Sequence, residues 1–194
     1  MCAIVFALVY AVAVLTETGQ RLDRDLLISL QHVAVGPIQW AWPVLARRVL
    51  PMVLLVGVVV LGLIVVGRRP RRAVAAGVVV GASTVLSLWL KGSLPRPVQG
   101  WDEGYTGNTY PSTHVSATTA LIVALWLMAP IRSPWLDRLL GGLVVFVALG
   151  NVVGQAHRPS DAIGSLLLVG CVTGSVAIAE RVTASRRGRF GDKA

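Results

Sequence analysis

The sequence predicts an all-α membrane protein, a polytopic helical bundle of about six transmembrane helices with an interfacial segment after the first. Of its 194 residues 55% are hydrophobic and only 14% are charged, and the mean hydropathy is +0.71. A soluble domain carries roughly 25% charged residues. Apolar runs of 16 to 18 residues alternate with short polar segments, at the low end of what a hydrocarbon core of roughly 30 Å requires. The basic residues gather in clusters between these runs, as in multi-pass membrane proteins.

The net charge and the cysteines exclude several classes of protein. The formal net charge is +9, but no basic stripe carries interleaved aromatic residues, so nucleic acid is not expected as a partner. Cys2 and Cys171 fit neither a disulfide framework nor a metal spacing and are expected to pack as small apolar residues. Sixteen arginines against two lysines are typical of a GC-rich bacterium. The sequence carries no signal of oligomeric state.

The first 50 residues are predicted to form one membrane helix and one interfacial segment. Residues 1–16 are an uncharged apolar run without a basic n-region or a cleavage site, which indicates a membrane helix rather than a signal peptide. Residues 17–25 are polar. In residues 26–50, prolines, glutamines and arginines interrupt the apolar pattern, and Trp40 and Trp42 are suited to the headgroup level, so this segment is expected at the interface.

Five further apolar runs are predicted to span the membrane. They cover residues 51–67, 73–90, 115–131, 139–156 and 162–179. The first of them ends in Arg68, Arg69, Arg71 and Arg72, which mark the cytoplasmic side. Residues 1–180 are expected to be a single membrane-embedded domain, and residues 181–194 a basic cytoplasmic tail.

The protein is expected in the plasma membrane, and the charge balance supports an orientation with both chain ends inside. In that orientation the inner segments have a net charge of +8 and the outer segments a net charge of +1. If residues 26–45 were a seventh span, the amino terminus would move outside. Both polar interruptions described next would still face away from the arginine cluster, on the extracytoplasmic side.

Two hydrophilic interruptions carry the residues suited to phosphate chemistry. Residues 91–114 read KGSLPRPVQGWDEGYTGNTYPSTH, and residues 157–161 read HRPSD. Both adjoin outer ends of predicted helices, where charged side chains avoid the lipid interior. Residues 98–110 would form a loop that gates a headgroup. The topology brings together six candidate residues: Lys91, Arg96, Ser112, His114, His157 and Asp161.

Each candidate has a chemical role that follows from its type and position. Ser112 precedes an apolar run as a helix N-cap, and the free N–H groups of a first helical turn bind phosphate. Asp161 follows His157 by four residues, so it could accept the Nδ1 proton and leave Nε2 free to attack. His114 is the candidate acid for the leaving oxygen. Lys91 and Arg96 would stabilise charge on the phosphoryl oxygens.

Three motifs in this order resemble the type-2 phosphatidic acid phosphatase superfamily, the lipid phosphate phosphatases that share an active site with vanadium haloperoxidases. The motifs are Lys91 with Arg96-Pro97, then Pro111-Ser112-Thr113-His114, then His157 with Asp161. The resemblance implies that His157 forms a phosphohistidine, that Asp161 orients it and that His114 protonates the departing alcohol. It also implies that Lys91, Arg96 and Ser112 bind phosphate, and that neither a metal nor an organic cofactor takes part.

The sequence departs from the family pattern at three places. Four residues separate Lys91 from Arg96 where the family more often has six, and Thr113 stands where glycine is usual. Asn151 occupies the position of a phosphate-binding arginine, and its amide donates hydrogen bonds but supplies no charge. Thr113 and Asn151 are still counted among the substrate-binding residues. Arg158, beside His157, is the candidate to replace the missing charge.

The predicted function is hydrolysis of a lipid phosphate. The candidate substrates are polyprenyl phosphate or diphosphate, phosphatidic acid and phosphatidylglycerol phosphate. Asn151 motivates an alternative from another class, a binder or carrier of anionic lipids that has lost turnover. A phosphotransferase that passes the phosphoryl group to an alcohol would use the same site.

Overall fold

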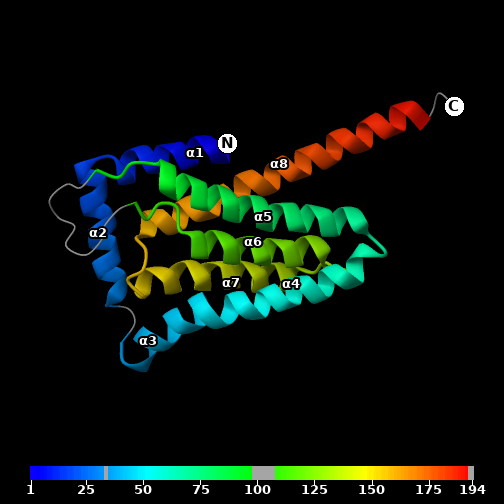
Figure 1. The fold of residues 1–194 in the computed structure, drawn as a ribbon. Helices are drawn as coiled ribbons and strands as arrows, with labels where there is room; N and C mark the ends of the chain where they lie inside the picture. The colour runs from blue at the N-terminus through cyan, green and yellow to red at the C-terminus, as the bar shows by residue number, and fades with distance from the viewer. Residues whose placement is uncertain (33–34, 98–107, 192–194) are drawn as a thin grey trace.

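The computed structural model describes residues 1–32, 35–97 and 108–191, with side chains through residue 185. Every regular element within these residues is a helix (Figure 1). The elements are α1 Cys2–Val9, η1 Tyr10–Val14, α2 Glu17–Gln31, α3 Pro37–Val44, η2 Leu45–Val49, α4 Leu50–Val66, α5 Pro70–Ser93, α6 Thr113–Met128, α7 Pro134–Val153 and α8 Pro159–Gly191. The predicted all-α fold is therefore confirmed.

Most of these helices are long and apolar enough to cross a membrane. Four meet that description, namely Pro37–Val66, Pro70–Ser93, Pro134–Val153 and Pro159–Ser185. The pair Cys2–Val14 and Glu17–Gln31 adds a fifth if counted together, although the two are bent by 89°. Thr113–Met128 is a shorter apolar helix. The chain is thus a multi-pass membrane protein, in agreement with a predicted count of about six.

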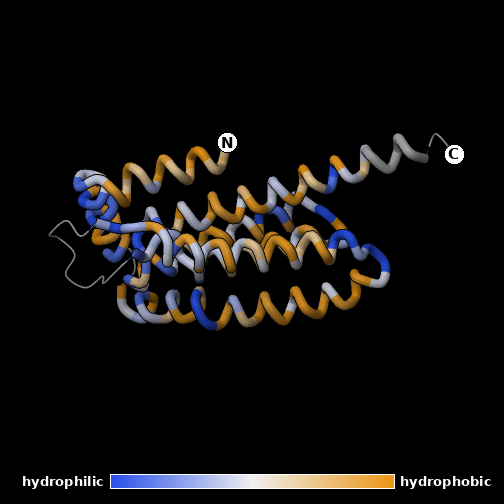
Figure 2. The backbone as a smooth tube through the Cα atoms, turned by 45° about the horizontal axis from the view of Figure 1, so that its top comes forward, coloured by the Kyte–Doolittle hydropathy of each residue, from blue (hydrophilic) through white to orange (hydrophobic). Residues whose placement is uncertain are grey.

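The outer surface of the bundle is apolar. The tube in Figure 2 is orange along much of the helices, and blue stretches gather toward the two ends of the bundle. In α4 nearly all of the exposed side chains are valine, leucine or isoleucine, and only Leu54 and Val65 are buried. A water-soluble helix would not expose such a surface, whereas lipid tails cover it without loss of free energy.

Helix α6 is the central element of the bundle. It contacts α4, α5, α7 and α8, and its buried residues include Ser116, Thr118 and Ala120. Small side chains allow membrane helices to approach closely. The first turn of α6 is therefore held among its neighbours, which fixes the position of the histidine that it carries.

The predicted interfacial segment is continuous with the span that follows it. Residues 37–50 do not lie apart from the next span, because α3, η2 and α4 form one helix of 30 residues. Pro43 lies inside this helix and is followed by the π-helical turn Leu45–Val49, so the chain continues without a break. Such single π-turns are common at functional sites. The amphipathic segment after the first helix is instead α2, which crosses one end of the bundle in Figure 1.

The two ends of the bundle differ in chemistry. Both polar interruptions lie at the end that α2 crosses, and the Arg68–Arg72 cluster lies at the turn between α4 and α5 at the opposite end (Figure 1). Helix α8 continues through residues 181–191 of the predicted basic tail. Residues 98–107 of the predicted gating loop, 98–110, lie outside the described residues.

Candidate active site

The two candidate histidines face each other at the α2 end of the bundle. His114 is the second residue of α6, and His157 lies in the connection between α7 and α8. Their ring centroids are 6.5 Å apart. His157 is only 4% exposed, whereas His114 is an exposed residue. A ligand that approaches this pair from outside the bundle therefore meets His114 first.

Asp161 lies in the first turn of α8 and is fully buried. Its Oδ2 is 3.6 Å from Nδ1 of His157 and accepts a hydrogen bond of 3.0 Å from the N–H of Arg158. Nδ1 of His157 makes no hydrogen bond within the described part of the chain. The carboxylate thus stands on the Nδ1 side of the imidazole, as the four-residue spacing predicted, at slightly more than hydrogen-bond distance.

Arg96 is held between two carboxylates. Its Nη1 lies 3.3 Å from Oδ1 of Asp161 and donates a hydrogen bond of 2.7 Å to the Thr109 hydroxyl. Its Nη2 lies 3.9 Å from Oδ2 of Asp23, and the Arg96 side chain is 4% exposed. Nε and Nη2 are buried without a hydrogen-bond partner among the described residues. Two donors of Arg96 therefore remain for a ligand.

Asp23 was not among the predicted site residues. It is 4% exposed on α2 and accepts hydrogen bonds from both the N–H and the hydroxyl of Ser160. Ser160 lies in the first turn of α8, beside Asp161. Asp23 therefore ties the crossing helix α2 to the element that carries Asp161. Its distance of 137 residues from Ser160 along the chain left no local signal of this contact.

Ser112 is a helix cap, as predicted. Its hydroxyl accepts a hydrogen bond of 3.3 Å from the N–H of Val115, and its own N–H donates to the carbonyl of Asp161 at 3.2 Å. The hydroxyl of Ser165 contacts the carbonyls of both Ser112 and Asp161, at 2.8 and 2.7 Å. The start of α6 and the start of α8 are thereby fixed side by side. Thr113 follows at the first helical position and is joined to Ser87 of α5 by a hydrogen bond of 3.2 Å.

Tyr110 anchors the segment that leads into α6. It is fully buried, and its hydroxyl donates a hydrogen bond of 3.0 Å to the carbonyl of Phe6. Asn108 accepts from the Tyr110 N–H and donates to the carbonyl of Lys91. Burial raises the pKa of the Tyr110 phenol, and the negative charge of Asp161 raises it further. Tyr110 therefore stays neutral and acts as a structural residue.

Arg158 is drawn into the buried cluster and is only 2% exposed. Burial lowers the pKa of its guanidinium, and the positive charge of Arg96 adds to that effect. Asp23 and Asp161 act in the opposite direction, so both carboxylates are within electrostatic range. Two arginines and two aspartates share this cluster, and their formal charges cancel.

Asn151 lies near the carboxyl end of α7 and is fully buried. Its amide nitrogen donates a hydrogen bond of 2.8 Å to the carbonyl of Val147, one turn earlier in the same helix. Its Oδ1 has no hydrogen-bond partner among the described residues. Lys91, at the end of α5, is close enough for its charge to act on His114. Lys91, unlike Asn151, brings a positive charge to the histidine pair.

A cavity of about 380 Å³ adjoins the exposed histidine. It is lined by Pro43, Val44, Arg47, Arg48 and His114. The two arginines belong to the π-helical turn η2, and sequence reasoning had assigned them to an interfacial segment. A pair of arginines inside an apolar stretch was the signal that could have included them among the site residues.

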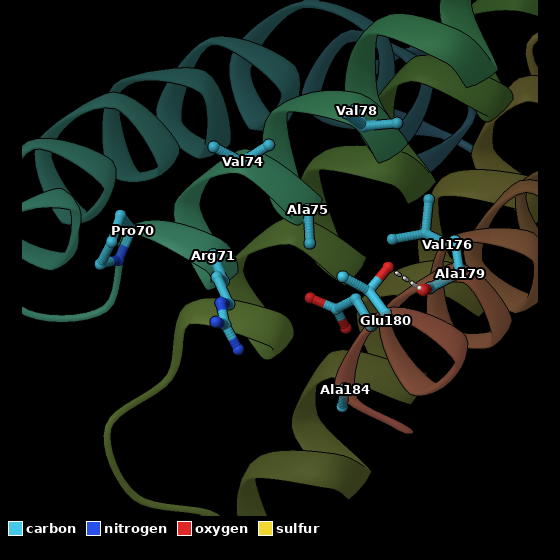
Figure 3. Close-up of a pocket in the computed structure, with 10 residues that line it drawn as sticks. Pro70, Arg71, Val74, Ala75, Val78, Val176, Ala179, Glu180 and Ala184 are labelled. Atoms are coloured by element: carbon cyan, nitrogen blue, oxygen red, sulfur yellow. Dashed lines mark hydrogen bonds between the residues drawn. The ribbon is translucent and has the colours of Figure 1, made fainter. Parts of the chain in front are cut away.

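Another cavity lies elsewhere, at the opposite end of the bundle. It has a volume of about 650 Å³ between α5 and α8, and mainly apolar side chains line it (Figure 3). Arg71 of α5 and Glu180 of α8 are the charged residues of its wall. It includes none of the predicted site residues. Within the described residues, no group of three or more histidine, cysteine, aspartate or glutamate side chains could hold a metal ion.

The fold and the site define the class of protein: a multi-pass membrane protein with paired histidines, a buried aspartate and several cationic side chains at one end of its bundle. The profile of the PAP2 superfamily matches residues 87–183, half of the sequence. The chain belongs to the PAP2 superfamily, and this membership indicates a phosphatase that acts on phosphate esters. Neither the curated proteins nor the solved structures contain a match.

Proposed function

We propose that this protein is a membrane lipid phosphatase that needs no metal and hydrolyses a phosphomonoester or diphosphate of a lipid through a phosphohistidine. The observation that carries the proposal is the pair His114 and His157, 6.5 Å apart, with Asp161 on the Nδ1 side of His157. One imidazole is thereby oriented for attack, and the other is free to transfer a proton.

In the first step Nε2 of His157 attacks phosphorus. A P–N bond forms and the P–O bond to the lipid alcohol breaks, while His114 donates a proton to the departing oxygen. Asp161 stabilises the positive charge on the phosphorylated imidazole. In the second step His114 removes a proton from water, which attacks phosphorus and breaks the P–N bond. Inorganic phosphate leaves, and both histidines return to their starting states.

Cationic and N–H groups around the pair would bind the phosphoryl oxygens. Arg96 offers two buried donors without partners, and Lys91 adds a charge beside His114. Ser112 and Thr113 open α6, whose first-turn N–H groups point toward the same end of the bundle. These groups would stabilise the charge that accumulates on the equatorial oxygens.

A lipid substrate is favoured because apolar space adjoins the buried cluster. A mainly apolar cavity of about 410 Å³ lies between α1, η1, α2 and α8, and Asp23 and Ser160 are in its wall. An acyl or prenyl chain could remain within the hydrophobic layer while the phosphate reaches the cluster. The candidates remain polyprenyl phosphate or diphosphate, phosphatidic acid and phosphatidylglycerol phosphate.

The proposed location is the plasma membrane, with the site on the extracytoplasmic side and residues 1–180 as one phosphatase domain. The Arg68–Arg72 cluster and the basic end of α8 lie away from the histidines. By the positive-inside rule they mark the cytoplasmic end.

The test is phosphate release from a panel of these lipid phosphates by the purified protein, with His157→Ala and His114→Ala as controls. We expect release by the wild type, none by His157→Ala, and a trapped phosphohistidine at residue 157. Unchanged release by His157→Ala would refute the mechanism.

The buried, neutral Asn151 favours a second candidate, an anionic-lipid binder that has lost turnover. It would bind lipid phosphate without a phosphoenzyme, so a phosphohistidine would exclude it. Product analysis with an added alcohol would separate a hydrolase from a phosphotransferase.

A further inference from the structure

We infer that Arg47, on the π-helical turn η2, supplies the positive charge to the phosphate that Asn151 does not. This inference rests on the proposed function and adds a substrate-binding residue to that site.

The buried cluster alone cannot neutralise a phosphate dianion. Arg96 and Arg158 are matched by Asp23 and Asp161, so their formal charges cancel. Asn151 adds none, and its amide nitrogen already donates to Val147. Only Lys91 and protonated His114 then compensate the dianion, and a further cation near the histidines would strengthen its binding, because a buried anion without compensation is strongly disfavoured.

Close packing places η2 directly against the part of α7 that carries Asn151. A Cβ at Gly150 would lie 2.6 Å from Cβ of Ala46, and one at Gly154 would lie 2.7 Å from Cβ of Pro43. The two helices approach this closely only because both positions are glycine. The indole of Trp42 adds a hydrogen bond of 3.0 Å to the carbonyl of Phe146. Ala46, the residue before Arg47, therefore packs against Gly150, the residue before Asn151.

The Arg47 side chain is suited to a ligand. Its Nε is buried and has no hydrogen-bond partner among the described residues. The residue lines the 380 Å³ cavity together with His114, and its charge acts on that imidazole. A buried N–H donor without a hydrogen bond is unfavourable unless a ligand accepts a hydrogen bond from it. A phosphoryl oxygen between His114 and His157 would be that partner, with a second guanidinium N–H available for a bidentate contact.

Arg48 does not replace Arg47 in this role. It lines the same cavity, but it is an exposed residue on the adjacent position of the helix. Successive residues of a helix point about 100° apart, so the two guanidinium groups do not contact one ligand with the same geometry. Arg48 thus provides an internal comparison.

The test measures kcat/KM for a lipid phosphate and inhibition by inorganic phosphate in Arg47→Gln, Arg47→Lys and Arg48→Gln. Arg21→Gln is the matched control, because Arg21 lies exposed on α2 at the same end of the bundle and pairs with Glu17. We expect Arg47→Gln to lower kcat/KM by about 100-fold, as for loss of one transition-state donor. The inhibition constant of phosphate should rise by about 10-fold or more. Arg47→Lys should give values between those of the wild type and those of Arg47→Gln, and Arg21→Gln should match the wild type.

Chemical rescue separates binding from a structural role. Guanidinium ion should restore part of the activity of Arg47→Ala, which a change in helix packing would not allow. The inference is overturned if Arg47→Gln retains the kcat/KM and phosphate inhibition of the wild type, or if Arg48→Gln alone shows the losses. In either case the proposed function stands as long as His157→Ala is inactive. Failure of the wild type to release phosphate would count against the proposed function. Calorimetric phosphate binding by the wild type and by Arg47→Gln would then still decide the role of Arg47.

Discussion

Nη1 of Arg96 lies 3.3 Å from Oδ1 of Asp161, and both side chains are almost completely buried. The aspartate therefore does not serve His157 alone, since one carboxylate oxygen pairs with Arg96 while the other lies on the Nδ1 side of the imidazole. A predicted phosphate ligand and a predicted orienting residue are thereby coupled. Asp23, 3.9 Å from the same guanidinium, extends this network to α2.

Asp161→Asn tests this coupling. The amide keeps the shape of the side chain but cannot stabilise the positive imidazole that forms after attack. We expect kcat to fall on the order of 10²- to 10⁴-fold, with the fold retained because Asp23 still faces Arg96. Phosphate release and thermal unfolding in detergent would measure the two effects. Asp137→Asn, at the far end of the bundle, should behave as the wild type, and equal activity in both variants would contradict the assignment.

Asp23→Ala is expected to lower stability. It would leave the buried N–H and hydroxyl of Ser160 without their acceptor, at about 1–3 kcal/mol for each unsatisfied group. Asp25→Ala, an exposed position on the same helix, is the matched control. A double-mutant cycle with Ser160→Ala should give a coupling free energy above about 0.5 kcal/mol. Additive effects of the two substitutions would show that the contact between α2 and α8 does not contribute to stability.

Ser112→Ala should affect both stability and activity. Loss of the hydroxyl removes the acceptor of the Val115 N–H, which costs about 1 kcal/mol for a helix cap. Ser133→Ala removes an equivalent cap from α7, where the hydroxyl accepts from Leu136 at 3.2 Å. Both variants should therefore lose similar stability, but only Ser112→Ala should raise KM for a lipid phosphate. A similar KM in the two would remove Ser112 from the binding residues.

The pH dependence of kcat/KM should be bell-shaped. Attack requires neutral His157, so the rate should fall as acid protonates that ring. Leaving-group protonation requires protonated His114, so the rate should fall again toward alkaline pH. Imidazoles in peptides titrate near about pH 6.5, so the curve should be measured from roughly pH 5 to 8. His114→Gln should lose the alkaline limb, and a flat wild-type curve would argue against paired histidines.

The sequence was sufficient to predict features that depend on neighbouring residues. Ser112 as the cap of α6 follows from local preferences, and this cap is present. The arrangement of the two polar interruptions at one end follows from alternating apolar spans. These predictions succeeded because a membrane restricts the chain to helices that cross it.

Contacts between distant segments could not be predicted in this way. Asp23 is part of a polar stretch that looks like an ordinary interfacial segment, and only the 89° bend brings it over Ser160. Arg47 was assigned to the interface because prolines, glutamines and arginines interrupt the apolar pattern of residues 26–50. The π-turn that carries the helix past Pro43 has no distinct sequence pattern.

The shortness of α6 has a consequence for the membrane around the protein. Its 16 residues span roughly 24 Å, less than the roughly 30 Å of a typical hydrocarbon core, whereas the neighbouring helices have 20 residues or more. In Figure 1 the start of α6, which carries His114, lies inward of the adjacent end of α7, and under the proposed function a lipid would present its headgroup there. A mismatch of this kind is relieved by local thinning of the bilayer. The thickness of the host membrane thus becomes a variable of the reaction, and bilayers of shorter acyl chains should bring substrate headgroups closer to the histidines.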